Sequence, residues 1–275
     1  MKAHPPNRAG IVAIAIVAAI LAVFIVLPLL SVAIEALAAG THALGDVYRE
    51  PSVVSAIGLS VAVTLVAVSV NAAFGLLAGW TIAKYRFPGK ALLVTVIDAP
   101  LTVSPVIAGL AVLSTLGTRT PAGAWLAEHG VRIAFAPAGI ALATMLVTFP
   151  YVARAVIAQM ALQGREYEEA AIGLGASAWG TFWRVTFPAS RASFLNGLLL
   201  CNARAIGEFG AVSVVSGSVR GVTETVPLHI ADYYNEANGP AAFGLAAGLA
   251  LVAIVLALAA RAVARRDALP KGRPA

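Results

Sequence analysis

Long apolar stretches recur along this chain, and they restrict its fold more than any other feature. A helix needs about 20 mostly apolar residues to cross the hydrocarbon core of a bilayer. Only 12% of the 275 residues are charged, against roughly 25% in soluble domains. We therefore predict an all-α membrane protein with six transmembrane helices. The six stretches are 11–36, 53–82, 91–116, 137–158, 193–216 and 241–262.

The first stretch has to be compared with a secretory signal. It follows Lys2 and Arg8, and Ala36-Leu37-Ala38 resembles a signal-peptidase site. The apolar core of a signal peptide has about 7–15 residues, and this stretch is much longer. We expect the first span to be retained, with a cleaved signal as the alternative.

Lysine and arginine predict the orientation, because they concentrate in cytoplasmic segments. Of the 19 such residues, 14 fall near the two termini or in the second and fourth connections, and Arg204 falls inside a span. Both termini are therefore predicted to be cytoplasmic. The predicted segments are an N-terminal piece (1–10), the membrane domain (11–262) and a basic tail (263–275). The remaining four basic residues, in the other loops, are Arg49, Arg119, Arg132 and Arg220.

The composition and the loops exclude several functions. The formal net charge is +6, but there is no basic stripe with interleaved aromatic residues, so no nucleic-acid surface is indicated. The loops are too short for a soluble domain, and no G-x-x-x-x-G-K-[ST] phosphate-binding run occurs. Work driven by ATP would therefore need another subunit.

Residues 166–188 read EYEEAAIGLGASAWGTFWRVTFP, an unusual segment in so apolar a chain. Negative charge at its start favours a helix N-terminus, so we predict a short helix that Gly175 breaks. We predict a second short helix that Ser177 caps and Pro188 ends. The alternative is an interfacial helix that only links the fourth and fifth spans. The acidic residues are Glu166, Glu168 and Glu169.

The spacing within this segment resembles a motif of ABC importer permeases, E-A-A-x3-G-x9-I-x-L-P. Val185 and Phe187 stand where that family prefers isoleucine and leucine. The resemblance implies that this cytoplasmic coupling loop (159–192) docks a short helix into a cleft on an ATPase subunit. The helix would convert ATP-driven closure into movement of the spans. The residues to which the resemblance assigns coupling are Glu168, Glu169, Ala170, Ala171, Gly175 and Pro188.

A second run, LCNARAIGEFGAVSVVSG at 200–217, resembles the sulfate/thiosulfate branch of these permeases. Molybdate and tungstate permeases share its A-R-x-x-G-E-F-G core, so a molybdate or tungstate importer is the alternative. The likeness extends over roughly residues 50–260. It continues at Val103–Leu110, Arg220-Gly221, Pro227-Leu228-His229 and Tyr234-Asn235-Glu236.

The resemblance also implies the rest of an importer in the bacterial cytoplasmic membrane. This chain would be a multi-pass transport subunit in contact with lipid, not an enzyme, and would bind no metal or cofactor. A second homologous permease would form a heterodimer with it, and two ATPase subunits would bind ATP and Mg. A periplasmic or lipid-anchored binding protein would deliver the oxyanion, which alternating access would move inward.

Charged and polar residues inside the spans are candidates for the substrate path or gate. Arg204 falls near the middle of the fifth span, and Glu208 follows four residues later on the same predicted helix face. Intramembrane charges are usually functional. The pair could attract an anion or only fix helix packing, and both interpretations stay open. The candidate path residues are Arg204, Glu208, Thr102, Ser104 and Ser213.

The third span contains Asp98, Pro100 and Pro105. The prolines should bend it, and Thr102 and Ser104 could bond the freed carbonyls or line the path. An acid on an anion route would repel substrate, so we favour a structural role for Asp98, near the membrane face or paired with a basic residue of a partner.

An outer loop carries His229 and Asp232 three residues apart. Two ligands are too few for an ordinary zinc site, so we predict instead a short helix over 227–234. That helix would close the outer mouth or meet the binding protein.

A competing function from another class is a proton-coupled secondary anion carrier that uses Asp98, Arg204 and Glu208. Such a carrier would need no ATPase, and the spacing of the coupling motif would then be accidental.

Overall fold

The computed structural model describes residues 8–38 and 40–268, and all regular elements in these ranges are helices. Most of the predicted N-terminal segment 1–10, and the end of the predicted tail 263–275, lie outside the described residues. The chain forms two compact units. One consists of Met1–Glu50 and Ile230–Gly248, and the other of Pro51–His229 and Leu249–Ala275.

The first unit begins with an apolar helical run that consists of α1 (Arg8–Leu21), the π turn η1 (Ala22–Val26) and α2 (Leu27–Ala38). From Gly10 to Ala38 this run is long and apolar enough to cross a membrane. Its large side chains are exposed, with Phe24 at 74%. Side chains of this kind are suited to lipid or to a partner helix, as the prediction of a first span requires.

The same unit contains α3 (Thr41–Arg49) and the start of α14 (Gly239–Ala268). Tyr48 Oη donates to Gly244 O at 3.0 Å. A methyl group on Gly248 would stand 2.1 Å from Tyr48 Oη, and one on Gly244 would stand 2.6 Å from Leu44 Cδ2. The G-x-x-x-G spacing of these two glycines therefore lets α3 and α14 pack closely.

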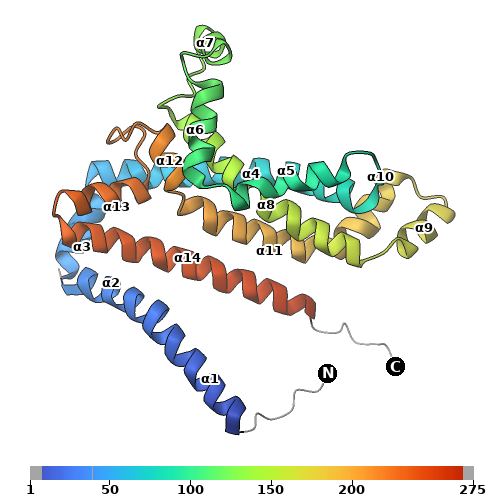
Figure 1. Cartoon of the computed structure of the whole chain (residues 1–275), viewed down its shortest axis with the longest axis horizontal. Helices are drawn as coiled ribbons and strands as arrows, with labels where there is room; N and C mark the ends of the chain where they lie inside the picture. Colours follow the sequence, from blue (N-terminus) through green and yellow to red (C-terminus); the bar gives the residue numbers. More distant parts are fainter. Residues whose placement is uncertain (1–7, 39, 269–275) are drawn as a thin grey trace. The chain divides into compact units, whose positions relative to one another are not determined.

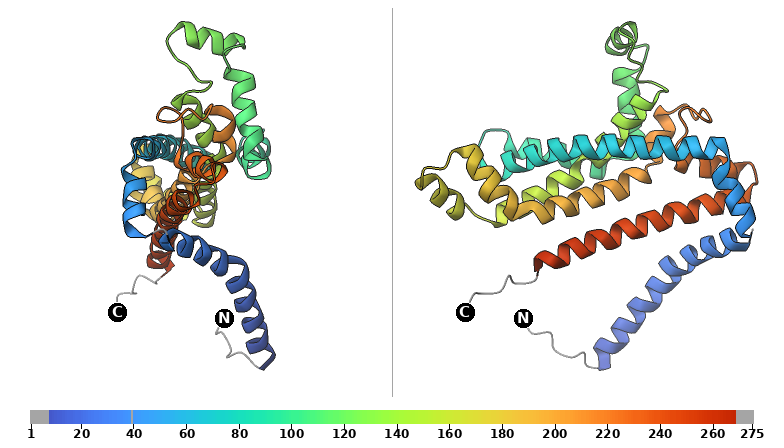
Figure 2. Two further views of the ribbon diagram at one scale, coloured as in Figure 1. Left: turned by 90° about the vertical axis from the view of Figure 1, so that its left-hand side faces the viewer. Right: turned by 180° about the vertical axis from the view of Figure 1, so that it is seen from behind.

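The second unit is built around α4 (Pro51–Lys84), α8 (Pro137–Leu162) and α11 (Phe187–Ile206), which lie side by side (Figure 1). Asn71 Nδ2 joins α4 to α8 inside this packing, donating to Thr148 Oγ1 at 2.8 Å and to Met145 O at 3.2 Å. Figure 2 shows from behind that α9 (Glu166–Gly173) and α10 (Ala178–Thr181) lie at one end of these helices, with α12 (Gly210–Val215) near the other.

Two glycines bring α4 and α8 into close contact. A Cβ on Gly75 would lie 2.8 Å from Val152 Cβ, and one on Gly79 would lie 2.6 Å from Val156 Cγ1. Small residues at such contacts let helix backbones approach closely in membranes. The G-x-x-x-G spacing of Gly75 and Gly79 thus serves the packing of these two helices.

Replacing Gly79 with alanine should lower the thermal unfolding temperature of the full chain in detergent. The added methyl group overpacks the α4–α8 contact, at a cost of about 1–3 kcal/mol. Gly58→Ala in the same helix is the matched control, because a Cβ there meets nothing within 4 Å. Equal unfolding temperatures for the two variants would refute this account of the contact.

The predicted span 91–116 is not one helix, and the bend that its prolines predict is found. It consists of α5 (Lys90–Thr102) and α6 (Pro105–Leu116), which are bent by 114°. Val103 and Ser104 between them are extended, because the residue before a proline avoids the helical region and Pro105 has no N–H to continue the helix. In Figure 1, α6 turns away from α4 and α5 and leads to α7 (Pro121–Glu128).

The predicted fifth span, 193–216, is also not one helix. α11 ends at Ile206, Gly207–Phe209 are not helical, and α12 follows. Nor does Pro188 end a helix. The helix runs from α10 through the π turn η2 (Phe182–Thr186) into α11.

The π turn accounts for the tolerance of Pro188. Proline has no N–H and crowds the carbonyl four residues before it, and a π turn is a common way to absorb such an irregularity within a helix. The N–H of Phe187 bonds Phe182 O across this turn. The same relation recurs in the first unit, where η1 ends two residues before Pro28 and Leu27 N bonds Ala22 O.

The count of six spans and the orientation of the termini stay predictions. Within the described residues, four helices are long and apolar enough to span a membrane, and the bent pair could make a fifth. The remaining predicted stretch corresponds to α11, which carries Arg191 and Arg204. The four helices are Gly10–Ala38, Pro51–Lys84, Pro137–Leu162 and Gly239–Val263.

Candidate functional site

The coupling loop is shorter than the predicted 159–192, because α8 continues to Leu162 and α11 begins at Phe187. It consists mostly of two helical segments. The first, α9, has all three predicted acidic residues in its first turn. It ends in two bonds typical of a Schellman motif, Gly175 N to Ile172 O at 2.9 Å and Ala176 N to Ala171 O at 3.0 Å. Gly175 has φ +88°, so the predicted break at this glycine is confirmed.

The predicted cap of the second segment is also confirmed. Ser177 Oγ accepts a hydrogen bond from Gly180 N at 3.2 Å and starts α10. Aromatic rings follow, and Phe182 packs between Trp80 of α4 and Trp183, with ring centroids 5.0 Å and 5.1 Å away. These contacts tie the second segment to the end of α4.

An apolar surface on this loop is left uncovered by the residues that the structure describes. Tyr167 is 77% exposed, Leu174 89% and Trp179 65%. Glu169 and Ala170 of the motif are exposed beside them. Exposed apolar groups gathered with polar neighbours are typical of a protein interaction site.

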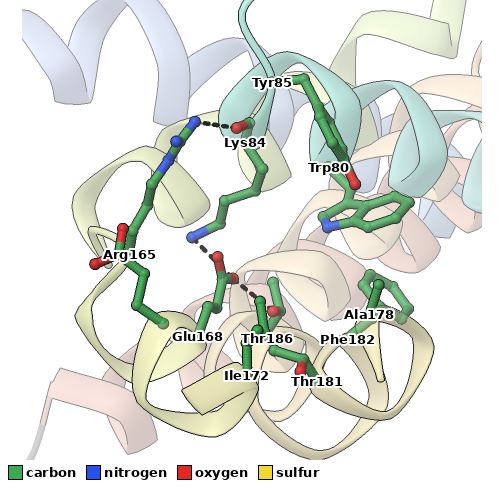
Figure 3. Close-up of a pocket in the computed structure, with 11 residues that line it drawn as sticks. Trp80, Lys84, Tyr85, Arg165, Glu168, Ile172, Ala178, Thr181, Phe182 and Thr186 are labelled. Carbon is green, nitrogen blue, oxygen red and sulfur yellow. Dashed lines mark hydrogen bonds and ion pairs between the residues drawn. The ribbon is translucent and has the colours of Figure 1, made fainter. Parts of the chain in front are cut away.

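Glu168 does not share this exposure. Its carboxylate Oε1 lies 3.0 Å from Lys84 Nζ and accepts a hydrogen bond from Thr186 Oγ1 at 2.5 Å. Lys84 Nζ also donates to Gly164 O at 2.7 Å, and the Arg165 guanidinium donates to Lys84 O. Figure 3 shows these groups converging at the edge of a cavity of about 190 Å³ that Trp80, Tyr85 and Phe182 line on the other side.

Sequence reasoning missed Lys84, which counted there only as an orientation charge. Its position at the C-terminal end of a long apolar helix, where a cation is favourable, was the available signal. Its partner lies more than 80 residues away, which no local pattern reveals.

The second candidate site lies where α11 ends. Arg204 Nη1 and Glu208 Oε2 are 2.5 Å apart, with the Glu208 side chain fully buried and that of Arg204 32% exposed. Glu208 Oε1 accepts a hydrogen bond from Ala211 N at 2.9 Å and so caps α12. The two residues therefore pair across a helix break, and the prediction that they share one helix face is wrong.

This break lies against the bend between α5 and α6. A Cβ on Gly210 would stand 3.0 Å from Pro105 Cβ, and one on Gly109 would stand 2.6 Å from Ala211 O. Glycine at both positions thus allows α6 and α12 to pack closely.

The remaining candidate path residues flank these two breaks. Thr102 and Ser104 are exposed at the bend, and Thr102 Oγ1 bonds Ala99 O at 3.0 Å, as expected for a hydroxyl near a proline. Ser213 is half-buried on α12, and its hydroxyl bonds Gly210 O at 2.9 Å.

Asp98 pairs within the chain. Its Oδ1 lies 3.3 Å from Nε of Arg154, which belongs to α8 rather than to the connection where the orientation count placed it. The suggestion of a basic residue from a partner is thus replaced by an intrachain ion pair between α5 and α8.

A buried acid–histidine pair, not predicted from the sequence, joins the segment before α13 (Val226–Asn235) to the first turns of that helix. His229 Nδ1 and Glu224 Oε2 are 2.7 Å apart, and both side chains are fully buried. The predicted short helix over 227–234 is confirmed as α13. Among the described residues no group of three His, Cys, Asp or Glu side chains could hold a metal ion.

Comparison with known proteins gives the family. The family described as "Binding-protein-dependent transport system inner membrane component" matches residues 72–267. The chain belongs to this family. It is therefore a membrane component of a binding-protein-dependent importer, as the coupling-loop motif implied.

Two relatives from Escherichia coli (strain K12) differ in similarity. The permease is 44% identical to "Sulfate transport system permease protein CysW" over 234 residues, which cover 85% of this chain and 80% of the relative. It is 34% identical to "Sulfate transport system permease protein CysT" over 211 residues, covering 77% and 76%. These relatives are transport permeases, so the prediction of a transport subunit rather than an enzyme is confirmed.

A solved structure supports the fold. A chain of a bacterial ABC transporter that imports the acidic polysaccharide alginate superposes with a TM-score of 0.75 at 16% identity, covering 95% of this permease and 96% of that chain. The likeness confirms the predicted all-α fold.

Proposed function

We propose that this permease imports sulfate or thiosulfate, driven by ATP hydrolysis on two ATPase subunits that dock against α9. The observation that carries the proposal is the exposed apolar surface of the coupling loop, on and just after α9, in a segment whose spacing resembles the coupling motif of ABC importer permeases. The similarity to a sulfate permease along most of the chain supports the anion. A periplasmic or lipid-anchored binding protein supplies it.

A second, homologous permease completes the membrane part. The curated relatives include two kinds of sulfate permease, and this chain is more similar to one than to the other. This difference supports a heterodimer in which the partner is of the CysT type.

The anion path passes the two adjacent helix breaks. Irregular backbone at membrane depth is tolerated where it lines a cavity or is buried in protein. Arg204 supplies a partly exposed positive charge there, while Glu208 holds it and caps α12. Thr102 and Ser104 offer exposed polar groups at the facing bend.

Uptake of radiolabelled sulfate in cells that lack this chain tests the proposal. Restoring the chain should restore uptake, molybdate in excess should leave most of it, and deleting the ATPase subunit should abolish it. If excess molybdate abolished sulfate uptake, molybdate or tungstate would be the better substrate assignment. Uptake that survives without the ATPase would indicate a secondary carrier and contradict the proposal.

A further inference from the structure

The two adjacent glutamates of the coupling motif have different surroundings. Glu169 is exposed, whereas the Glu168 side chain is only 17% exposed. Glu168 faces Lys84, whose side chain is 7% exposed. Only one of the two acids is therefore available to a docking partner, and the other is committed to a contact inside the chain.

We propose that Lys84 is a positioning residue for energy coupling, and that its ion pair with Glu168 fastens the docking helix α9 to the end of α4. The inference rests on the proposed function, in which α9 receives the movement of the ATPase. We infer that α4 is the first spanning helix to receive this movement.

The contacts around Lys84 join three elements. Its amine binds the Glu168 carboxylate on α9 and the Gly164 carbonyl in the turn before α9. Thr186 Oγ1, in η2, donates to the same carboxylate oxygen. The Arg165 guanidinium donates to the Lys84 carbonyl, which as the last residue of α4 has no partner within its own helix. A shift of α9 therefore pulls on the end of α4 directly (Figure 3).

The burial of the amine explains why the joint is stiff. A buried ammonium group is stable only where hydrogen-bonding and charged partners replace its water. Separation of Lys84 from Glu168 would leave two poorly hydrated charges, so the two helices move together rather than slide apart.

The course of α4 explains why this matters for transport. The helix has 34 residues, which corresponds to roughly 50 Å. Near its other end, Ser60 Oγ accepts a hydrogen bond from Val226 N at 2.9 Å, at the start of α13. Movement applied at Lys84 can thus reach the segment that carries the buried Glu224–His229 pair.

The test compares four variants of the complete importer reconstituted in proteoliposomes. Lys84→Met and Glu168→Gln remove one charge of the pair, and Lys84→Arg preserves it. Lys90→Met is the matched control, because Lys90 begins α5 six residues after Lys84, is only half-buried, and donates to a backbone carbonyl, Tyr85 O, at 3.3 Å. Labelled sulfate uptake and ATP hydrolysis are measured on the same vesicles, and assembly is measured by co-purification.

We expect Lys84→Met and Glu168→Gln to assemble and hydrolyse ATP while sulfate imported per ATP falls at least fivefold. Lys84→Arg and Lys90→Met should stay within twofold of the wild type. A normal ratio in Glu168→Gln, or a loss in Lys90→Met equal to that in Lys84→Met, would overturn the inference. If Lys84→Met does not assemble, Glu168→Gln alone decides.

The same experiment distinguishes a wrong substrate assignment from a wrong role for Lys84. A wild-type complex that hydrolyses ATP without importing sulfate would count against sulfate as the substrate. A normal wild type with an unaffected Glu168→Gln variant would count against the role of Lys84 alone.

Discussion

Replacing Gly175 with alanine is expected to reduce ATP-dependent uptake about tenfold, while Gly173→Ala leaves most of it. Gly175 has φ +88°, a conformation that costs an L-residue roughly 1–2 kcal/mol. That cost disfavours the turn that sets α9 at its angle to the rest of the loop. Uptake is measured in cells, and co-purification of the ATPase shows whether the subunit still docks.

Gly173 is a close control for this change. It is helical, and a Cβ at either glycine meets nothing within 4 Å, so the two substitutions differ in backbone conformation and not in space within the chain. Alanine also favours a helix over glycine. If both variants lost the same amount of uptake, contact with the ATPase subunit, and not the turn at Gly175, would be the reason for small residues at these two positions.

Arg204→Met should have the second large effect. It leaves the buried Glu208 carboxylate without its counter-charge, and breaking a buried ion pair in this way costs about 3–5 kcal/mol. We expect poor assembly of the complex, measured by co-purification of the two permeases, and uptake near background.

The double variant Arg204→Met/Glu208→Gln separates packing from anion attraction. The glutamine oxygen can still accept a hydrogen bond from Ala211 N, and no buried charge is left unpaired. We expect assembly to recover while sulfate uptake stays at least tenfold low, because the positive charge on the path is gone. Recovery of both would show that the pair serves packing only.

Local signals in the coupling loop were sufficient to predict its form. The acidic first turn, the glycine break and the serine cap each depend on residues within one or two helical turns, and each is found at its predicted residue. The role of Pro188 was not predictable in the same way. Whether a proline ends a helix or is accommodated by a π turn depends on how well the continuing helix packs.

The bends and the buried charges needed tertiary information. Pro105 predicts that the third span is interrupted, but the angle follows from the packing of α6 on α12, which Gly109 and Gly210 permit. Lys84 pairs across 84 positions with Glu168. The sequence pattern marks such residues as charged and cannot show which partner the fold brings to them.

The unbroken helix through Pro188 has a mechanical consequence. Segments of 4, 5 and 20 residues join in α10, η2 and α11 without a loop, forming a rod of roughly 40 Å. One end carries the exposed Trp179, and the other carries Arg204. A continuous helix rotates as one body, so a small rotation imposed at the docking surface would turn Arg204 about the helix axis. The flexible joint of this part of the permease is then Gly207–Phe209, which follows Arg204, so the arginine charge moves together with the helix.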